Sequence, residues 1–133
     1  MNDNLQLHII CTQIPPDTWR GEPAHRFGLQ DKKGILDDGV KQLDGTRRFD
    51  CEVTPRLNGD DVDFSGPHVQ GTKGSRFLYL SWAYDAGGWV KRIKIPLAGI
   101  TTEQILSGKP LEAIIEARDA VATTKPIYGW KTV

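Results

Sequence analysis

The chain has 133 residues, a length that fits one domain with its own hydrophobic core and needs no metal or disulfide for stability. Its 17 basic and 17 acidic side chains cancel, which argues against nucleic acid or an anionic membrane as a partner. The first residues lack the basic start and apolar run of a signal peptide, and no window approaches the roughly eighteen apolar residues of a membrane span. We therefore expect a cytoplasmic protein.

Short alternating runs fill the first half of the chain. Residues 5–12 alternate between apolar and polar side chains, a pattern typical of a half-buried strand, and Pro15 and Pro16 end that run. Glycine- and aspartate-rich turns separate the strands that follow, which we predict at residues 26–30, 35–36 and 47–54. The proline and the Asn-Gly-Asp-Asp sequence in residues 55–63 predict a loop, and a brief strand is expected at 68–70.

The two cysteines, Cys11 and Cys51, both fall on the apolar side of alternating runs. They are expected to be buried, reduced thiols that pack as small hydrophobic side chains. A disulfide between neighbouring strands is the alternative. Neither has a second cysteine nearby, so their spacing does not indicate a zinc site.

The clearest structural signal is a β-hairpin. Two apolar runs, residues 76–84 and 89–97, flank a short glycine-containing break. If Tyr84 faces Trp89, the register brings four apolar side chains onto one face and leaves Phe77 and Tyr79 on the other. The four residues predicted to enter the core are Leu78, Leu80, Ile93 and Ile95.

One helix is predicted, over residues 102–107. Thr101 and Gln104 have the spacing of a capping box, and Ile100 and Ile105 occupy the positions of a hydrophobic staple. Gly108 ends the helix after about two turns. Two further strands are predicted beyond it, at residues 111–118 and, as an edge strand, at 125–132.

Seven to nine short strands with one short helix predict a mainly β fold, an antiparallel β-sandwich formed by residues 1–133 as one domain. Two parts of the chain resemble a C2-type sandwich. One is the opening strand that runs into a proline-containing loop, and the other is a late strand ending in W-A-Y-D (residues 82–85), followed by a turn and I-K-I-P-L-A-G-I. The resemblance implies that fold. It does not extend to calcium-dependent lipid binding, because no paired-aspartate loops surround Asp85.

Three other segments carry a second resemblance: F-G-L-Q-D-K-K-G, G-P-H-V-Q-G and R-F-L-Y-L-S-W. They are similar to an uncharacterised family of small bacterial proteins, a domain of unknown function. The resemblance implies a bacterial source and supplies no activity, cofactor or partner.

Candidate site residues come from three groups. His68 lies in a glycine-rich approach to the hairpin and could transfer a proton or, with Arg76, contact an anion. Asp60, Asp61 and Asp63 could supply oxygen ligands to a divalent cation, although an aspartate before a glycine is also ordinary turn chemistry. The glycines at 66–71 do not match a phosphate-binding loop in spacing or context, and no nucleophile signature is present.

Aromatic residues form the third group. Trp82, Tyr84 and Trp89 gather at the tip of the predicted hairpin, where exposed rings would suit a small ligand or a partner protein. The first hypothesis is therefore a non-enzymatic binding module without a cofactor, and its site includes these rings, His68 and Arg76. The alternatives are a small enzyme with a cleft near His68, Arg76 and the loop at 60–63, and a cation-dependent binding module. Open edge strands at residues 5–12 or 125–133 would also allow a homodimer.

Overall fold

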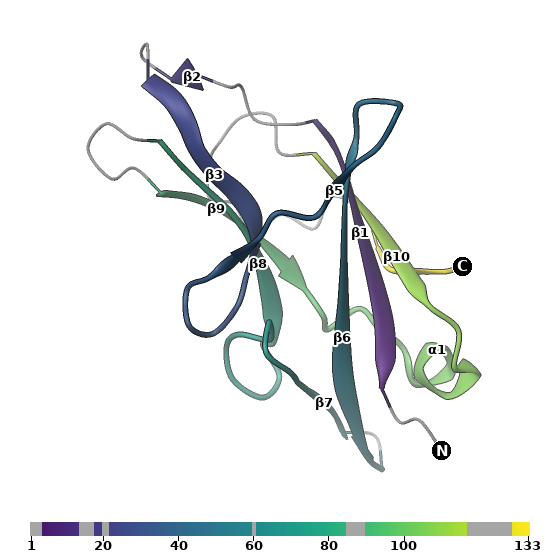
Figure 1. Cartoon of the computed structure of the whole chain (residues 1–133). Helices are drawn as coiled ribbons and strands as arrows, with labels where there is room; N and C mark the ends of the chain where they lie inside the picture. The colour runs from purple at the N-terminus through teal and green to yellow at the C-terminus, as the bar shows by residue number, and fades with distance from the viewer. Residues whose placement is uncertain (1–3, 14–17, 20–21, 60, 85–89, 117–128) are drawn as a thin grey trace.

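The computed structural model describes residues 4–13, 18–19, 22–59, 61–84, 90–116 and 129–133 (Figure 1). The described chain is mainly β, with two sheets and one short helix. Within these residues no helix is long and apolar enough to cross a membrane.

The first sheet has the strand order β11-β10-β1-β6-β5, and β7 also pairs with β6. Its longest members are β1 (Leu5–Gln13) and β6 (Arg47–Asn58). Figure 1 shows β1 between β6 and β10, with β7 on the opposite side of β6 from β1. The remaining strands of this sheet are β5 (Val40–Lys41), β7 (Asp61–Ser65), β10 (Leu111–Glu116) and β11 (Lys131–Thr132).

The second sheet has the order β2-β3-β8-β9, and β4 pairs with the end of β3. All of its pairs are antiparallel. Its strands are β2 (Thr18–Trp19), β3 (Glu22–Gln30), β4 (Leu36–Asp37), β8 (Phe77–Tyr84) and β9 (Val90–Pro96).

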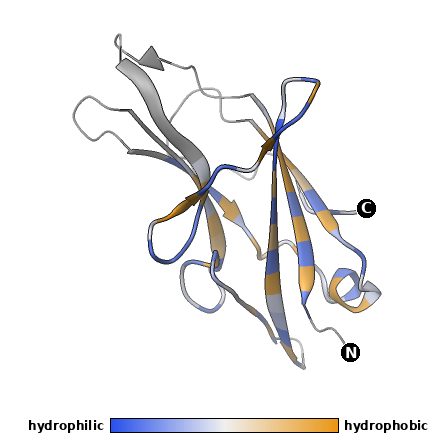
Figure 2. Ribbon diagram, in the orientation of Figure 1, coloured by the Kyte–Doolittle hydropathy of each residue, from blue (hydrophilic) through white to orange (hydrophobic). Residues whose placement is uncertain are grey.

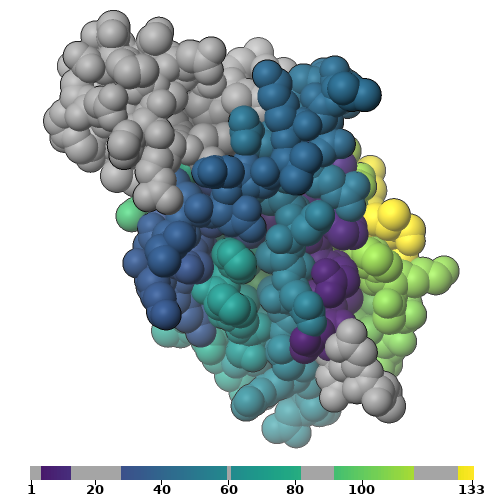
Figure 3. All heavy atoms as spheres, in the orientation of Figure 1, coloured from purple at the N-terminus to yellow at the C-terminus, as the bar shows by residue number. Residues whose placement is uncertain are grey.

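One hydrophobic cluster joins the two sheets. Figure 2 shows the alternation of apolar and polar residues along β1, β6 and β10 that directs every second side chain inward. The first sheet supplies fully buried side chains such as Leu7 and Phe49, and the second supplies Leu29, Leu78 and Leu80. Figure 3 shows the outer surfaces of β6, β1 and β10 side by side. The predicted mainly β, two-sheet fold is confirmed.

The hairpin and the helix are also confirmed in detail. The register of β8 with β9 pairs Trp82 with Lys91, Leu80 with Ile93 and Leu78 with Ile95, as the alternation predicts. The four predicted core residues are all buried. The helix α1 spans Thr102–Ser107, with the predicted capping box formed and Gly108 in the left-handed conformation at its end.

The prediction of a loop over residues 55–63 was wrong. The strand β6 runs on to Asn58, a turn at Gly59 follows, and β7 pairs back along Thr54–Asn58. Two shorter strands also differ. The strand predicted at 68–70 is reduced to one bridge between Gln70 and Phe77, and β3 begins at Glu22, four residues earlier than predicted.

The pairing of β1 bears on two further predictions. It lies antiparallel to β6 and parallel to β10, so it is a central strand and offers no edge to a second copy. Cys51 pairs with Leu7, four residues along β1 from Cys11, and strand spacing separates the two thiols by about 13 Å. A disulfide cannot span that distance. Neither cysteine forms a disulfide, and both are buried, as expected.

Candidate functional site

The helix α1 is short and is held in place by specific contacts. The Thr101 hydroxyl accepts from the backbone N–H of Gln104, and the Gln104 side chain accepts from the N–H of Thr101. The Gln104 amide also donates to the carbonyl of Trp130 at 2.9 Å, and the Trp130 indole donates to the carbonyl of Pro96 at 2.9 Å. These bonds fix α1 against the C-terminal segment and the end of β9, while Ile105 packs on the core.

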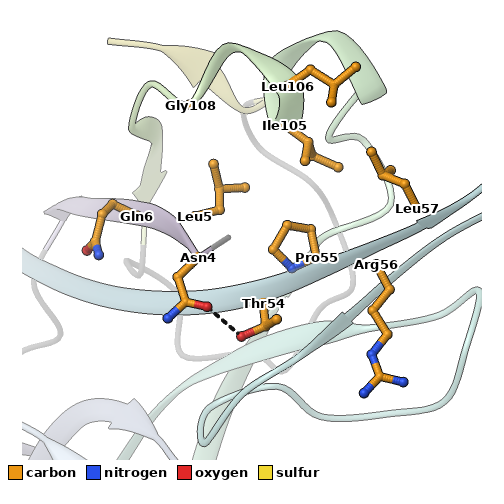
Figure 4. A pocket seen from close by; sticks show the side chains of 10 residues that line it. All are labelled: Asn4, Leu5, Gln6, Thr54, Pro55, Arg56, Leu57, Ile105, Leu106 and Gly108. Carbon is orange, nitrogen blue, oxygen red and sulfur yellow. Dashed lines mark hydrogen bonds between the residues drawn. The ribbon is translucent and has the colours of Figure 1, made fainter. Parts of the chain in front are cut away.

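A groove with a volume of about 680 Å³ lies beside α1, between the start of β1 and the second half of β6 (Figure 4). In Figure 4, Ile105 and Leu57 point towards one another across it, and Leu106 lies at its rim. Leu57 is 38% exposed and Leu106 is 71% exposed. The groove is lined by Asn4, Leu5, Gln6, Thr54, Pro55, Arg56, Leu57, Ile105, Leu106 and Gly108.

The polar side chains of the groove lie on one side of it. Figure 4 shows Asn4, Thr54 and Arg56 pointing away from α1. The Thr54 hydroxyl donates to the side-chain oxygen of Asn4 at 2.8 Å, and the Asn4 amide donates to Glu52. Arg56 makes no hydrogen bond or ion pair with a described residue. Its cross-strand neighbour Asp63 is bonded to another arginine.

That arginine is Arg76, one of the sequence-predicted site residues. Its Nε donates to Asp63 at 2.9 Å, and its Nη1 donates to the carbonyl of Gly71. The two charged side chains are 26% and 24% exposed. The Arg76 guanidinium lowers the pKa of Asp63, and the bonded carboxylate raises the pKa of Arg76. The pair therefore links β7 to the residue that precedes β8.

A second, smaller cavity of about 210 Å³ lies beside this pair. Arg76 contributes to its lining, and the other side chains are mainly apolar. The lining residues are Val62, Phe64, Gly74, Arg76, Ala98 and Ile100.

The acidic group predicted to hold a cation is distributed along β7. Asp61 forms an ion pair with Lys73 at 3.2 Å, Asp63 is bonded to Arg76, and Asp60 lies outside the described residues. Among the described residues, no group of three or more His, Cys, Asp or Glu side chains could hold a metal ion. A cation site that includes Asp60 stays a prediction.

His68 lies close to the turn at residues 31–35 and is not bonded to Arg76. The backbone N–H of Lys32 donates to the carbonyl of Pro67 at 2.9 Å. The backbone N–H of Ile35 lowers the pKa of Asp31, and the nearby His68 adds to that effect. In the described part of the chain His68 forms no hydrogen bond, so the structure does not bring His68, Arg76 and Asp63 together as a bonded set.

Two of the three predicted aromatic residues lie at the far end of β8. Trp82 and Tyr84 belong to this strand, whereas Trp89 lies outside the described residues. The proposed role of the three side chains in binding stays a prediction.

Two further clusters lie on the outer faces of the sheets. On the first sheet, the Nδ1 of His8 is 2.6 Å from a carboxylate oxygen of Asp50, to which Arg48 donates at 3.0 Å. Burial alone would raise the pKa of Asp50, but these bonds hold it below its usual value. On the second sheet, Arg92 lies over the ring of Tyr79 and Lys94 over that of Phe77, at 5.2 and 4.6 Å from the ring centres.

The groove was not found from the sequence, because three distant segments form it. The signal that could have indicated it is two leucines without an assigned packing role. Leu57 falls in the segment predicted to be a loop, and Leu106 follows the staple residue Ile105 in a two-turn helix. Both remain exposed in the fold, and both line the same groove, unlike the exposed Leu43, which lies in a turn.

Comparison with known proteins identifies a family for this chain but supplies no activity. The model of a family of unknown function, DUF5990, matches residues 5–133. No curated protein and no solved structure matches the chain.

Proposed function

The chain belongs to DUF5990, a family of unknown function, and we propose that it is a non-catalytic binding module whose site is the groove beside α1. The observation that carries the proposal is the groove itself: about 680 Å³, with apolar walls and two exposed leucines at its edge. Clefts of roughly 300–1,000 Å³ with mainly apolar walls and a few polar groups are typical binding sites.

The chemistry of the lining supports binding over catalysis. The polar side chains at the groove are amides, a hydroxyl and a guanidinium, from Asn4, Gln6, Thr54 and Arg56. None of these groups exchanges a proton readily near neutral pH, as a general acid or base must. The groove therefore suits a ligand with apolar groups that is held and released unchanged.

The enzyme hypothesis lacks a comparable observation. It requires His68 to work with Arg76 or a carboxylate, but Arg76 is already bonded to Asp63 and to Gly71. That hypothesis stays a prediction, as do the aromatic site at Trp82, Tyr84 and Trp89, the cytoplasmic location and the bacterial source.

The test is selection of short peptides on the folded protein. A phage-displayed library of peptides of about nine residues, long enough to cross the groove in extended form, is selected on the wild-type chain. Binding is then measured with Leu57→Asp and Leu106→Asp, each of which places a charge against the apolar wall. Leu43→Asp is the matched control, because Leu43 lies in a turn and is fully exposed.

The proposal predicts that the selected peptides bind the wild type and the Leu43→Asp control but neither groove variant. A library that yields no binder, or binders that tolerate both groove variants, would contradict it. Thermal melts of all variants show that any loss of binding occurs in a folded protein.

A further inference from the structure

The strand β6 is longer than its neighbour β1. Pairing between them ends where Leu5 faces Val53, whereas β6 continues for five residues, Thr54–Asn58, that pair only with β7 among the described residues. Figures 1 and 4 show β7 along the opposite edge of β6 from β1. Among the described residues, the groove therefore lies along an unpaired edge of β6, in line with β1, at the place where a further strand would fit.

The groove also has the side-chain alternation of a strand site. Figure 4 shows Pro55 and Leu57 pointing to the α1 side, together with Leu5, and Thr54 and Arg56 pointing to the other. An extended segment in this place would have an apolar wall on one face and polar groups on the other. Its own side chains alternate with a period of two, so apolar and polar residues in alternation match it.

We infer that the groove takes an extended segment of a partner protein as an added strand beside β6, with apolar side chains against α1 and an acidic side chain beside Arg56. This inference rests on the proposed function and names its ligand. Adding a strand to an open sheet edge is a general mode of peptide recognition, in which main-chain bonds give affinity and alternate side chains give specificity.

The positive charge of Arg56 is the reason to expect an acidic residue in the bound segment, called the guest below. Arg56 is the one charged side chain among the described residues that line the groove, and it is exposed. Asp63, the carboxylate opposite it on β7, is bonded to Arg76 instead. A carboxylate from the guest would therefore meet a guanidinium without an ion pair in the described structure.

Pro55 is compatible with an added strand at this edge of β6. A proline has no N–H to donate and occurs in sheets where that side of the strand is open. Pro55 pairs with Phe64 of β7, and its missing N–H is least costly if the proline nitrogen lies on the edge of β6 towards the groove. In that orientation the Pro55 carbonyl and the N–H and carbonyl of Leu57 would remain for a guest segment, because alternate residues of a strand direct these groups to the same edge. Five residues of edge, about 17 Å long, favour a short, specific segment.

The experiment uses the peptides selected above and measures their binding by fluorescence polarisation. Each backbone amide of a selected peptide is N-methylated in turn, which removes one main-chain donor and leaves the side chains unchanged. Strand addition predicts that methylation at every second position weakens binding by about fivefold or more, and that the intervening positions tolerate it. A uniform or absent effect would overturn strand addition while leaving groove binding, and hence the proposed function, intact.

A charge exchange tests the residue beside Arg56. The variant Arg56→Glu is expected to weaken binding of the acidic peptides by about tenfold, and replacement of the peptide's acidic residue by lysine is expected to restore it. Lys41→Glu, in the exposed β5, is the control and should have no effect. Failure of the lysine peptide to recover binding to folded Arg56→Glu would contradict the charge pairing.

Further measurements on the same variants distinguish two other possible occupants of the groove. If the groove holds a second copy of this chain, the wild type sediments as a dimer and Leu57→Asp as a monomer. If the chain's own first three residues occupy it, their deletion strengthens peptide binding by about tenfold or more. Either result would overturn the assignment to a partner protein.

Discussion

The capping box of α1 offers a sharp test of how the groove wall is held. Thr101→Ala removes the hydroxyl that accepts from the N–H of Gln104 and leaves that donor unpaired at the first turn. A helix of six residues has little stability of its own, so its caps and its tertiary contacts must hold it. Thr101→Ser keeps the hydroxyl and is the matched control.

The expected fall in Tm for Thr101→Ala follows from the free energy of a helix cap and from the length of the chain. Loss of a Ser or Thr cap costs about 1 kcal/mol of unfolding free energy, within a range of about 0.5–2. For 133 residues the unfolding entropy is about 0.28 kcal/mol per kelvin, so 1 kcal/mol corresponds to a fall of about 3–4 °C in Tm. Thr101→Ser should lie within about 1 °C of the wild type, because serine is at least as good a cap.

The assay is thermal unfolding followed by far-ultraviolet circular dichroism, with peptide binding measured on the same samples. Thr101→Ala should lower both Tm and peptide affinity, since α1 carries Ile105 and Leu106 of the groove. An unchanged Tm in Thr101→Ala, or equal losses in the alanine and serine variants, would refute the role assigned to the capping box.

Three further predictions concern the fold. In Gly28→Ala a new Cβ would lie 2.3 Å from the carbonyl oxygen of Asp37, so urea unfolding should show a loss of about 1–3 kcal/mol in the free energy of unfolding. Gly99→Ala, where the new Cβ meets open space, should change that free energy by less than about 0.5 kcal/mol. The bond from Arg76 holds the pKa of Asp63 below its usual value, so the stabilising effect of the carboxylate is present above that usual value and is lost as the pH falls through the folded pKa. Asp63→Asn should therefore lose less stability than the wild type between pH 7 and pH 3, and an equal loss would contradict the Arg76 contact. Burial raises the pKa of Cys51 to about 12, so Ellman's reagent should react with this thiol in guanidinium but not in the native protein at pH 8. A rapid reaction of Cys51 in the native protein would show that the thiol is accessible.

Local sequence patterns were enough to predict the elements whose signals lie within a few residues of one another. The two-residue period of residues 77–80 and 92–95 determined the hairpin register, because a shift by one residue would expose the four core side chains. The spacing of Thr101, Gln104 and Gly108 determined the helix.

The extension of β6 was missed for a physical reason. Pro55 and the Asn58-Gly59 pair have the composition of a loop, yet a proline fits a strand whose other edge is open, and Gly59 supplies the tight turn at φ 64°. The parallel pairing of β1 with β10 was also not predictable, because alternation is the same in parallel and antiparallel strands. The groove depends on both features, since the extension of β6 supplies residues 54–57 and the parallel pairing with β10 brings the end of α1 to the start of β1.

The measurement that tests the central claim most directly is an NMR map of ¹H–¹⁵N shifts as a selected peptide is added to the full chain. We expect the largest changes at the backbone amides that border the groove, those of residues 5–6, 54, 56–57 and 105–108. Changes centred instead on Arg76 and Gly71, or on the end of β8 at Trp82 and Tyr84, would contradict the groove as the binding site and return the site to the residues predicted from sequence.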